Sequence, residues 1–278
     1  MFLYKQWEMF CRALDNNDIH SVTAVSLLEG NVNKEEFLVL KHDVETNPSK
    51  ALKLAEIENR YFHKGSYYVQ AYLLNDKKNI EVLNKIKALG HEVSYHHDVM
   101  DSNKGDMEKA RLEFLRYKKL FEQNGFPIST VCQHGNPVIE RQGYTSNRDF
   151  FRDNRIQNEF LSVTEIMVNY KEKLKVNYKY VSDAGYGWKV IFDPENNDIY
   201  DSSDKNIPID DFKKLITYTK ENRCLIISTH PHRWHSNKYK ALFKDSIFKA
   251  IKNIAKLLLK IPGMKKVMGR FYFLAKKI

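Results

Sequence analysis

The segment FLVLKHDVE at residues 37–45 sets the architecture that we expect for the rest of the chain. Residues 37–41 form a compact apolar run, which is typical of a buried strand, and the run ends abruptly in the polar motif HDVE. A helix is expected to follow at once, because Pro48 suits a first helical turn and Thr46 or Asn47 suits its cap. The segment therefore predicts a buried strand with a polar end, followed by a helix.

The same order of strand and helix recurs along the chain. Further strands are predicted at 65–74, 91–96, 129–135, 178–185 and 223–230. Helices are predicted at 4–15, 79–90 with Gly90 as the C-cap, 103–124 and 212–222. This alternation favours an α/β protein with a mainly parallel sheet and helices outside it.

Polar motifs fall at the carboxyl ends of the predicted strands. They read HDVE, SYHHD, QHG, SDAG and STHP. In parallel α/β barrels and open sheets this edge is where active sites form. We therefore expect these motifs to meet in one site.

Composition limits the class of protein. The 278 residues are 42% apolar and 13% aromatic, which is enough for a large core. No run reaches the roughly 18–20 apolar residues of a membrane span, and the N-terminus lacks a signal-peptide layout. The three cysteines are far apart, so we expect a reducing, cytoplasmic setting.

The positive charge is concentrated at the C-terminus. Residues 238–278 hold 12 Lys or Arg and one acid, whereas residues 1–237 hold 33 bases and 34 acids. We accordingly divide the chain into a body, 1–237, and a basic tail, 238–278. Apolar residues recur at helical spacing in the tail, at Phe243, Ile247, Ile251, Ile254 and Leu258.

Such a basic amphipathic helix is the pattern of a peripheral anchor on an anionic membrane surface. The alternative is an ordinary helix whose apolar stripe packs on the body. A nucleic-acid partner is not expected, because the body is neutral and the apolar stripe is long.

The first polar motif offers two carboxylates. Alternation along a strand places Asp43 and Glu45 on the same side, where one can bind a metal and the other can accept a proton from water. The alternative is a local cap on the following helix.

Histidines dominate two other motifs. His91, His96 and His97 fall within seven residues, and imidazole beside carboxylate suits Zn, Fe, Co or Ni. His230 follows an apolar run and is expected to point into the mouth of the sheet, where imidazole suits a general acid. His232 and His235 are expected on the surface.

Taken in order, HDVE, GHEVSYHHD, QHGNP, YVSDAGYGW and LIISTHP resemble the polysaccharide deacetylase (NodB-homology, carbohydrate esterase 4) superfamily. The resemblance is to the branch found with bacterial surface-polysaccharide genes, and it covers about residues 35–235. It implies a distorted parallel (β/α) barrel of fewer than eight strands. It also implies a divalent metal, usually zinc, that acts with water on an N-acetyl group.

The resemblance assigns roles by position. Asp43 matches the base, Glu45 and His96 match metal ligands, and His230 matches the late-strand acid. Asp183 and Trp188 match residues that support the site and its substrate.

Two positions depart from the family pattern. Met100 stands where a second histidine ligand is usual, so His97, Asp98 or His134 would have to replace it. We prefer Asp98 as a ligand, because alternation gives it the same face as His96. The usual arginine of the third motif is absent, and His134 holds a comparable place toward the substrate.

The segment 139–155 is rich in charge and aromatic rings, and Arg148 within it is a candidate to hold a sugar. The alternative is an exposed polar connection.

Three functions remain open. The first is a metal-dependent deacetylase acting on an N-acetylated sugar of a surface-glycan precursor, linked to a lipid or a nucleotide. The second is a sugar-binding relative without a competent metal, docked at the membrane by its tail. The third is a hydrolase of a non-sugar amide on the same barrel.

Overall fold

The structure is a computed structural model, and it describes residues 2–136, 139–199 and 206–258. Its strands are β1 Phe2–Leu3, β2 Ser21–Val22, β3 Phe37–Val44, β4 Gly65–Val69, β5 Glu92–His97, β6 Thr130–Gln133, β7 Thr164–Glu165, β8 Lys179–Ser182, β9 Trp188–Val190, β10 Ile207–Ile209, β11 Cys224–Thr229 and β12 Trp234–His235.

Its α-helices are α1 Tyr4–Asp15, α2 Ala24–Leu28, α3 Pro48–Arg60, α4 Lys77–Ala88, α5 Val99–Ser102, α6 Met107–Gln123, α7 Asp149–Arg152, α8 Asn154–Glu159, α9 Tyr170–Leu174, α10 Phe212–Glu221 and α11 Lys238–Leu258. Two 3₁₀ turns, η1 Ala71–Asn75 and η3 Pro231–Arg233, lie among them.

The larger sheet is mixed. Its strand order is β10-β9-β8-β11-β3-β4-β5-β6-β7, with β2 also paired to β3. Strands β8, β11, β3, β4, β5, β6 and β7 run parallel, whereas β9 and β10 are antiparallel to their neighbours. The predicted α/β class is therefore confirmed. Of the expected distorted parallel barrel, the structure has the run of seven parallel strands; the sheet as a whole is mixed, and no pairing closes it from β7 to β10 within the described residues.

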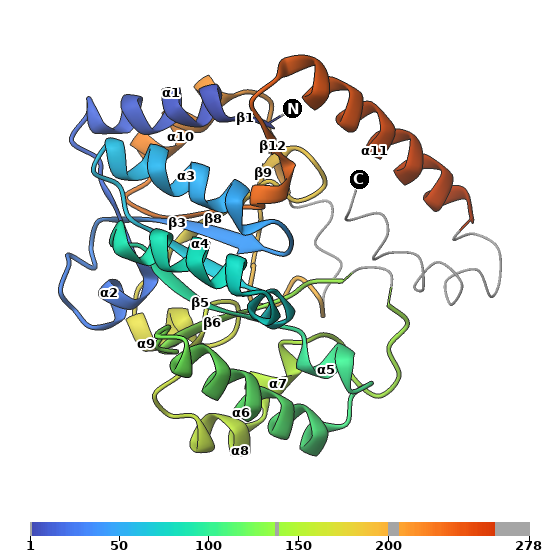
Figure 1. Cartoon of the computed structure of the whole chain (residues 1–278). Coiled ribbons are helices and arrows are strands. Elements are labelled where there is room, and N and C mark those ends of the chain that lie inside the picture. The colour runs from blue at the N-terminus through green and yellow to red at the C-terminus, as the bar shows by residue number, and fades with distance from the viewer. Residues whose placement is uncertain (1, 137–138, 200–205, 259–278) are drawn as a thin grey trace.

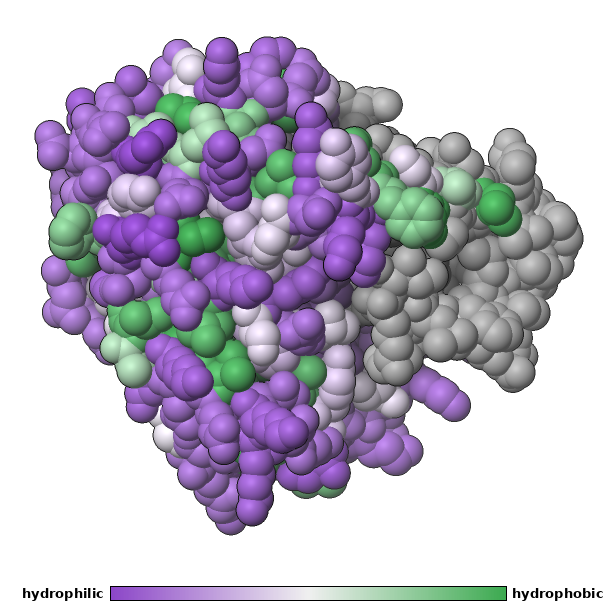
Figure 2. Space-filling model, turned by 45° about the horizontal axis from the view of Figure 1, so that its top comes forward, coloured by the Kyte–Doolittle hydropathy of each residue, from purple (hydrophilic) through white to green (hydrophobic). Residues whose placement is uncertain are grey.

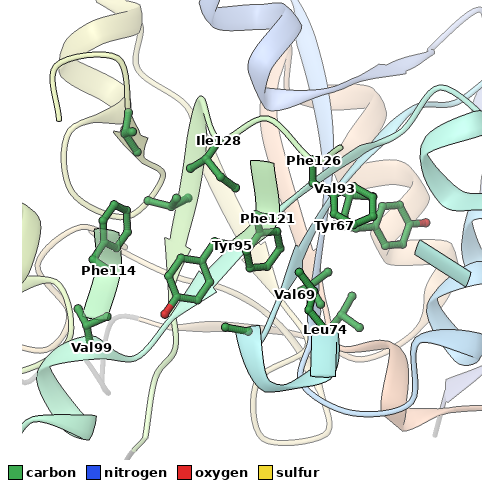
Figure 3. Packing of buried hydrophobic residues seen from close by; sticks show 14 of the residues in the cluster. Tyr67, Val69, Leu74, Val93, Tyr95, Val99, Phe114, Phe121, Phe126 and Ile128 are labelled. Atoms are coloured by element: carbon green, nitrogen blue, oxygen red, sulfur yellow. The ribbon is translucent and has the colours of Figure 1, made fainter. Parts of the chain in front are cut away.

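Helices cover the outer side of the parallel strands. Helices α10, α1, α3 and α4 lie side by side in that order, and α6 packs against β5 (Figure 1). Two clusters of buried Leu, Phe, Tyr and Trp side chains form the core between these helices and the sheet. Figure 3 shows one of them, in which the Tyr95 ring lies 5.7 Å from Phe114 and 5.3 Å from Phe121.

Two predicted elements are shorter than expected. The helix predicted at 103–124 begins only at Met107, the first residue of α6, because Lys104 and Gly105 adopt φ of 54° and 85°, which no α-helix accepts. The strand predicted at 65–74 ends at Val69, and the chain then turns into η1. From this turn the Tyr72 hydroxyl donates to the Glu45 carbonyl at 2.5 Å.

Strand β3 is buried along its whole length, and its side chains alternate between two environments. Leu38 and Leu40 face the helices, whereas Phe37 and Val39 face an inner apolar cluster. Continuing the alternation places Lys41, Asp43 and Glu45 above this inner cluster, at the carboxyl edge of the sheet.

On the helical side of β3 lies a fully buried carboxylate. Glu58 of α3 accepts hydrogen bonds from Trp7 Nε1 at 2.9 Å and the Tyr67 hydroxyl at 2.7 Å. His42 Nε2 lies 2.8 Å from the same carboxylate. Burial alone would raise the pKa of Glu58, but His42 and these hydrogen bonds hold it below its ordinary value. The network ties α1, α3, β3 and β4 together.

His91 belongs to the same layer and is a structural residue. Its Nδ1 accepts from the Gly65 amide at 2.9 Å, and its Nε2 lies 3.1 Å from the Ala55 carbonyl. Both ring nitrogens are therefore occupied by backbone, and the side chain lies away from the carboxyl edge.

Helix α11 leaves the body at a corner of the molecule (Figure 1). It follows β12, which pairs with β1. Among the described residues, no helix combines the length and the apolar character that crossing a membrane requires. The second part of the predicted tail, residues 259–278, lies outside the described residues.

We predict that Glu58→Gln lowers the free energy of unfolding by about 2–4 kcal/mol at neutral pH, because it leaves a buried network without its charge. The pKa of Glu58 is lower in the folded protein than in the unfolded one. Its carboxylate therefore contributes fully to the free energy of unfolding above the ordinary carboxyl pKa of about 4.3, and this contribution is lost as the pH falls through the pKa of the folded protein. Urea denaturation between neutral and acid pH measures this, with exposed Glu56→Gln as the control. Equal stabilities of the two variants at neutral pH would contradict the prediction.

Candidate active site

A cavity of about 700 Å³ opens at the carboxyl edge of the parallel strands. Side chains from the ends of β3, β5, β6, β8 and β11 line it, as do residues of the segment 139–155. The prediction that the polar motifs meet at one edge of the sheet is therefore confirmed. The predicted site residues on its wall are Asp43, Glu45, His96, Arg148 and His230.

At the floor of the cavity Lys41 and Asp43 form a buried ion pair. The Lys41 Nζ lies 2.6 Å and 2.7 Å from the two Asp43 oxygens and 3.3 Å from Ser228 Oγ. Burial alone would lower the pKa of Lys41, but the Asp43 carboxylate raises it well above its ordinary value. Burial would likewise raise the pKa of Asp43, but Lys41, His96 and His230 lower it. Both groups are therefore charged at neutral pH.

Three side chains beside this pair form a group suited to a metal ion. One donor atom each from Glu45, His96 and His134 lie within 4.8 Å of one another. His134 Nε2 is 3.1 Å from Glu45 Oε1, a separation that two ligands of one ion can have. A second, overlapping group consists of Asp43, His96 and Cys132. The first group is the better candidate, because Lys41 already engages Asp43.

The tautomer of His96 fits a ligand role. Its Nδ1 lies 3.0 Å from the Cys132 carbonyl, which can only accept, so the proton is on Nδ1 and Nε2 keeps its lone pair. Burial lowers the pKa of His96 to about 3, which keeps the ring neutral. An oxygen and two imidazole nitrogens suit zinc or a neighbouring divalent ion.

Beside the carboxylates of Asp43 and Glu45, His230 is held by a third, buried carboxylate. Its Nδ1 lies 2.5 Å from Asp183 Oδ1, which also receives the Arg233 guanidinium at 2.8 Å. Burial would raise the pKa of Asp183, but Arg233 and His230 lower it well below its usual range. The His230 Nε2 atom is thereby turned toward the carboxylates, 3.8 Å from Asp43 Oδ2 and 4.0 Å from Glu45 Oε1.

The structure separates the three alternatives for the missing ligand. Strand β5 ends at His97, so alternation no longer applies to Asp98, whose backbone (φ −134°, ψ 28°) begins α5 instead. Asp98 belongs to neither donor group, whereas His134 belongs to one of them. His97 faces the helices among Phe114, Phe150 and Phe151. Met100 is buried in the core.

Two predicted substrate residues lie behind the cavity wall. Asp183 is fully buried and acts on His230, as described above. Trp188 packs in an aromatic cluster, with ring centroids 5.6 Å from Phe2 and 6.4 Å from Trp7, and does not line the cavity. Its expected contact with substrate is therefore corrected to a packing role.

Arg148 does line the cavity, but it is already engaged. Its Nη1 lies 2.7 Å from Asp198 and its Nη2 donates to Asn197 at 2.8 Å. It thus fixes the segment 194–198 on the cavity wall. Arg141 from the same region also lines the cavity and is held by both oxygens of Asp101 at 2.8 Å.

Sequence reasoning missed several cavity residues, among which Lys41 carries charge and His232 an imidazole ring. Lys41 could have been found from the alternation that joins Asp43 to Glu45, because it lies two residues before Asp43 on the same face. His232 was expected on the surface, but it lines the cavity, and burial lowers its pKa to about 3. Its placement depends on the turn η3, which the sequence did not predict.

Comparison with known proteins leaves the class of protein open. No family model matches the chain. The chain is 31% identical over 111 residues to the uncharacterized protein L113 of Acanthamoeba polyphaga mimivirus. That similarity covers 38% of this chain and 61% of the viral protein, so the chain spans about three fifths of its relative.

We predict that His134→Ala weakens zinc binding by more than about 100-fold, because loss of an outer partner alone can weaken a site by 10- to 100-fold. Glu45→Ala and His96→Ala are expected to do the same, whereas Asp98→Ala should bind zinc as the parent does. Equilibrium dialysis with elemental analysis measures this. Zinc binding that survives His134→Ala but not Asp98→Ala would restore the original assignment.

Proposed function

We propose that the protein is a metal-dependent hydrolase that removes the acetyl group from an N-acetylated sugar of a surface-glycan precursor. The observation that carries this proposal is the convergence of three groups at the carboxyl edge of the parallel strands. They are the Glu45–His96–His134 donors, the charged Asp43, and the His230 ring held by Asp183. The parallel order β8-β11-β3-β4-β5-β6-β7 also supports the distorted barrel that the resemblance implies.

A divalent ion held by Glu45, His96 and His134 would polarise an amide carbonyl and make water a better nucleophile. The chain's own residues then divide the proton transfers. Asp43 is ionised and faces the donor group, so its carboxylate takes the proton of the attacking water.

His230 supplies the second proton transfer. Its Nε2 atom faces the cavity and gives a proton to the departing amide nitrogen as the carbon–nitrogen bond breaks. Asp183 accepts the Nδ1 hydrogen, which orients the ring and stabilises the imidazolium form, the form that carries a second proton on Nε2 to give. The products are acetate and a free amine on the sugar.

A second candidate is a sugar-binding protein without turnover. The observation that favours it is the Lys41–Asp43 ion pair, in which Lys41 lies within 2.7 Å of both carboxylate oxygens. A carboxylate engaged in this way is a weaker base. Saturable sugar binding by calorimetry, with no acetate released under any metal, would favour this reading.

The first test is acetate release. Protein loaded with Zn, Co or Ni is incubated with N-acetylated oligosaccharides, nucleotide-linked N-acetyl sugars and, as a separate arm, acetylated peptides. We expect release from a sugar, and Asp43→Asn is expected to lower kcat by about 100- to 10,000-fold through loss of the base. Release from peptides alone would instead support a non-sugar amide hydrolase.

We further predict that Asp183→Asn lowers kcat by about 10- to 100-fold with little change in KM, because the neutral amide no longer stabilises a charged His230 ring and can hold the ring in the wrong tautomer. Steady-state kinetics measure this. The exposed Asp210→Asn provides the matched control and should leave both constants unchanged. A rise in KM with kcat preserved would assign Asp183 to substrate binding instead.

A further inference from the structure

Four lysines from two separate helices lie near one another. Lys50 and Lys53 are one turn apart on α3, and Lys240 and Lys244 are one turn apart on α11. Burial, Lys244 and Lys53 together lower the pKa of Lys50 to about 8. Burial together with Lys50, Lys244 and Lys240 also lowers the pKa of the neighbouring His235. We call Lys50, Lys53, Lys240 and Lys244 the lysine cluster.

The lysine cluster has no internal counter-charge within the part of the chain that the structure describes. No carboxylate there forms an ion pair with any of the four, whereas Lys41, Lys109, Lys118 and Lys214 each have one. Like charges brought together without acids create a positive potential that attracts an external anion.

Large apolar side chains are exposed on the same part of α11. Tyr239 is 81% exposed and Phe243 is 68% exposed, and Leu242 between them is 43% exposed. Ala241, in contrast, is buried, so this turn packs on the body along one side only. Figure 2 shows apolar residues at the surface along this helix, where it borders the grey atoms.

The lysine cluster is joined directly to the cavity. Lys50 Nζ donates to the His232 carbonyl at 2.5 Å, and His232 lines the cavity two residues after His230. Helix α11 begins four residues after Trp234, which follows the cavity residue Arg233. A partner held by the cluster therefore lies next to the opening.

We propose that the lysine cluster, together with Tyr239, Leu242 and Phe243, is a docking surface for an anionic lipid bilayer. The lysines match the phosphate groups of the lipid heads, and the exposed rings and leucine enter the boundary between heads and acyl chains. A nucleic acid would match the charge but would leave Leu242 and Phe243 without an apolar environment. The corollary that the substrate is a lipid-linked sugar rests on the proposed function, whereas the docking itself does not.

The test uses the full chain and vesicles made of equal parts phosphatidylcholine and phosphatidylglycerol. The variant Lys53→Gln/Lys240→Gln/Lys244→Gln keeps Lys50, which holds the backbone of His232. At about fivefold for each lysine, its vesicle affinity is expected to fall on the order of 100-fold in co-sedimentation. The matched control, Lys77→Gln/Lys78→Gln/Lys85→Gln on α4, removes the same charge and should bind as the parent does.

A second variant, Tyr239→Ser/Phe243→Ser, examines the apolar half of the surface. We expect it to bind the vesicles about tenfold more weakly while its binding to a single-stranded RNA oligonucleotide is unchanged. The proposal is overturned if the lysine variant binds vesicles as the parent does or if the α4 control loses as much affinity. It is also overturned if the parent prefers the RNA to the vesicles at the same ionic strength.

Docking and catalysis are separated by one further pair of measurements. Asp43→Asn is expected to bind the vesicles normally, and the lysine variant is expected to release acetate from a water-soluble sugar at the parent's rate. Failure of acetate release in the parent with normal vesicle binding would remove the proposed function and leave the docking surface standing.

Discussion

Strand β3 imposes the constraint on which the rest of the structure depends, because it is buried on both faces and yet carries four ionisable side chains in its last part and at its end. A buried charge is tolerated only when it is paired and hydrogen-bonded. On the inner face Lys41 and Asp43 satisfy each other, and on the outer face His42 is matched by Glu58. On its outer face, strand β3 therefore needs an acid from α3. On its inner face, it places two charged side chains at the bottom of the cavity.

Much of this arrangement could be predicted from the sequence. The apolar runs at 37–41 and 223–230 became β3 and β11, and Pro48 begins α3 with Asn47 at its cap. The polar motifs were placed correctly because the carboxyl ends of parallel strands share one edge, a consequence of topology that needs no side-chain detail. The convergence of Asp43, Glu45, His96 and His230 on one cavity follows from that rule.

The rest could not be predicted, for local reasons. Asp98 was assigned to the face of His96 by continuing the strand one residue too far, and backbone angles at a strand end are not readable from residue types. Trp188 was predicted to contact the substrate, but its ring packs in the core against the aromatic rings of Trp7 on α1 and Trp234 on β12. The antiparallel pair β9 and β10 was missed because each strand has three residues, too few for a periodic pattern.

That short pair has a consequence for how the molecule behaves in concentrated solution. Within the described chain β10 is an edge of the large sheet, and an edge strand with free amide and carbonyl groups is a template for pairing with another molecule. Strand β10 reads Ile-Pro-Ile, and Pro208 in its centre has no amide hydrogen to donate. Ile207 is 63% exposed on this edge. The proline nevertheless interrupts the ladder of backbone hydrogen bonds that a second chain would need, which disfavours fibrous self-association through β10.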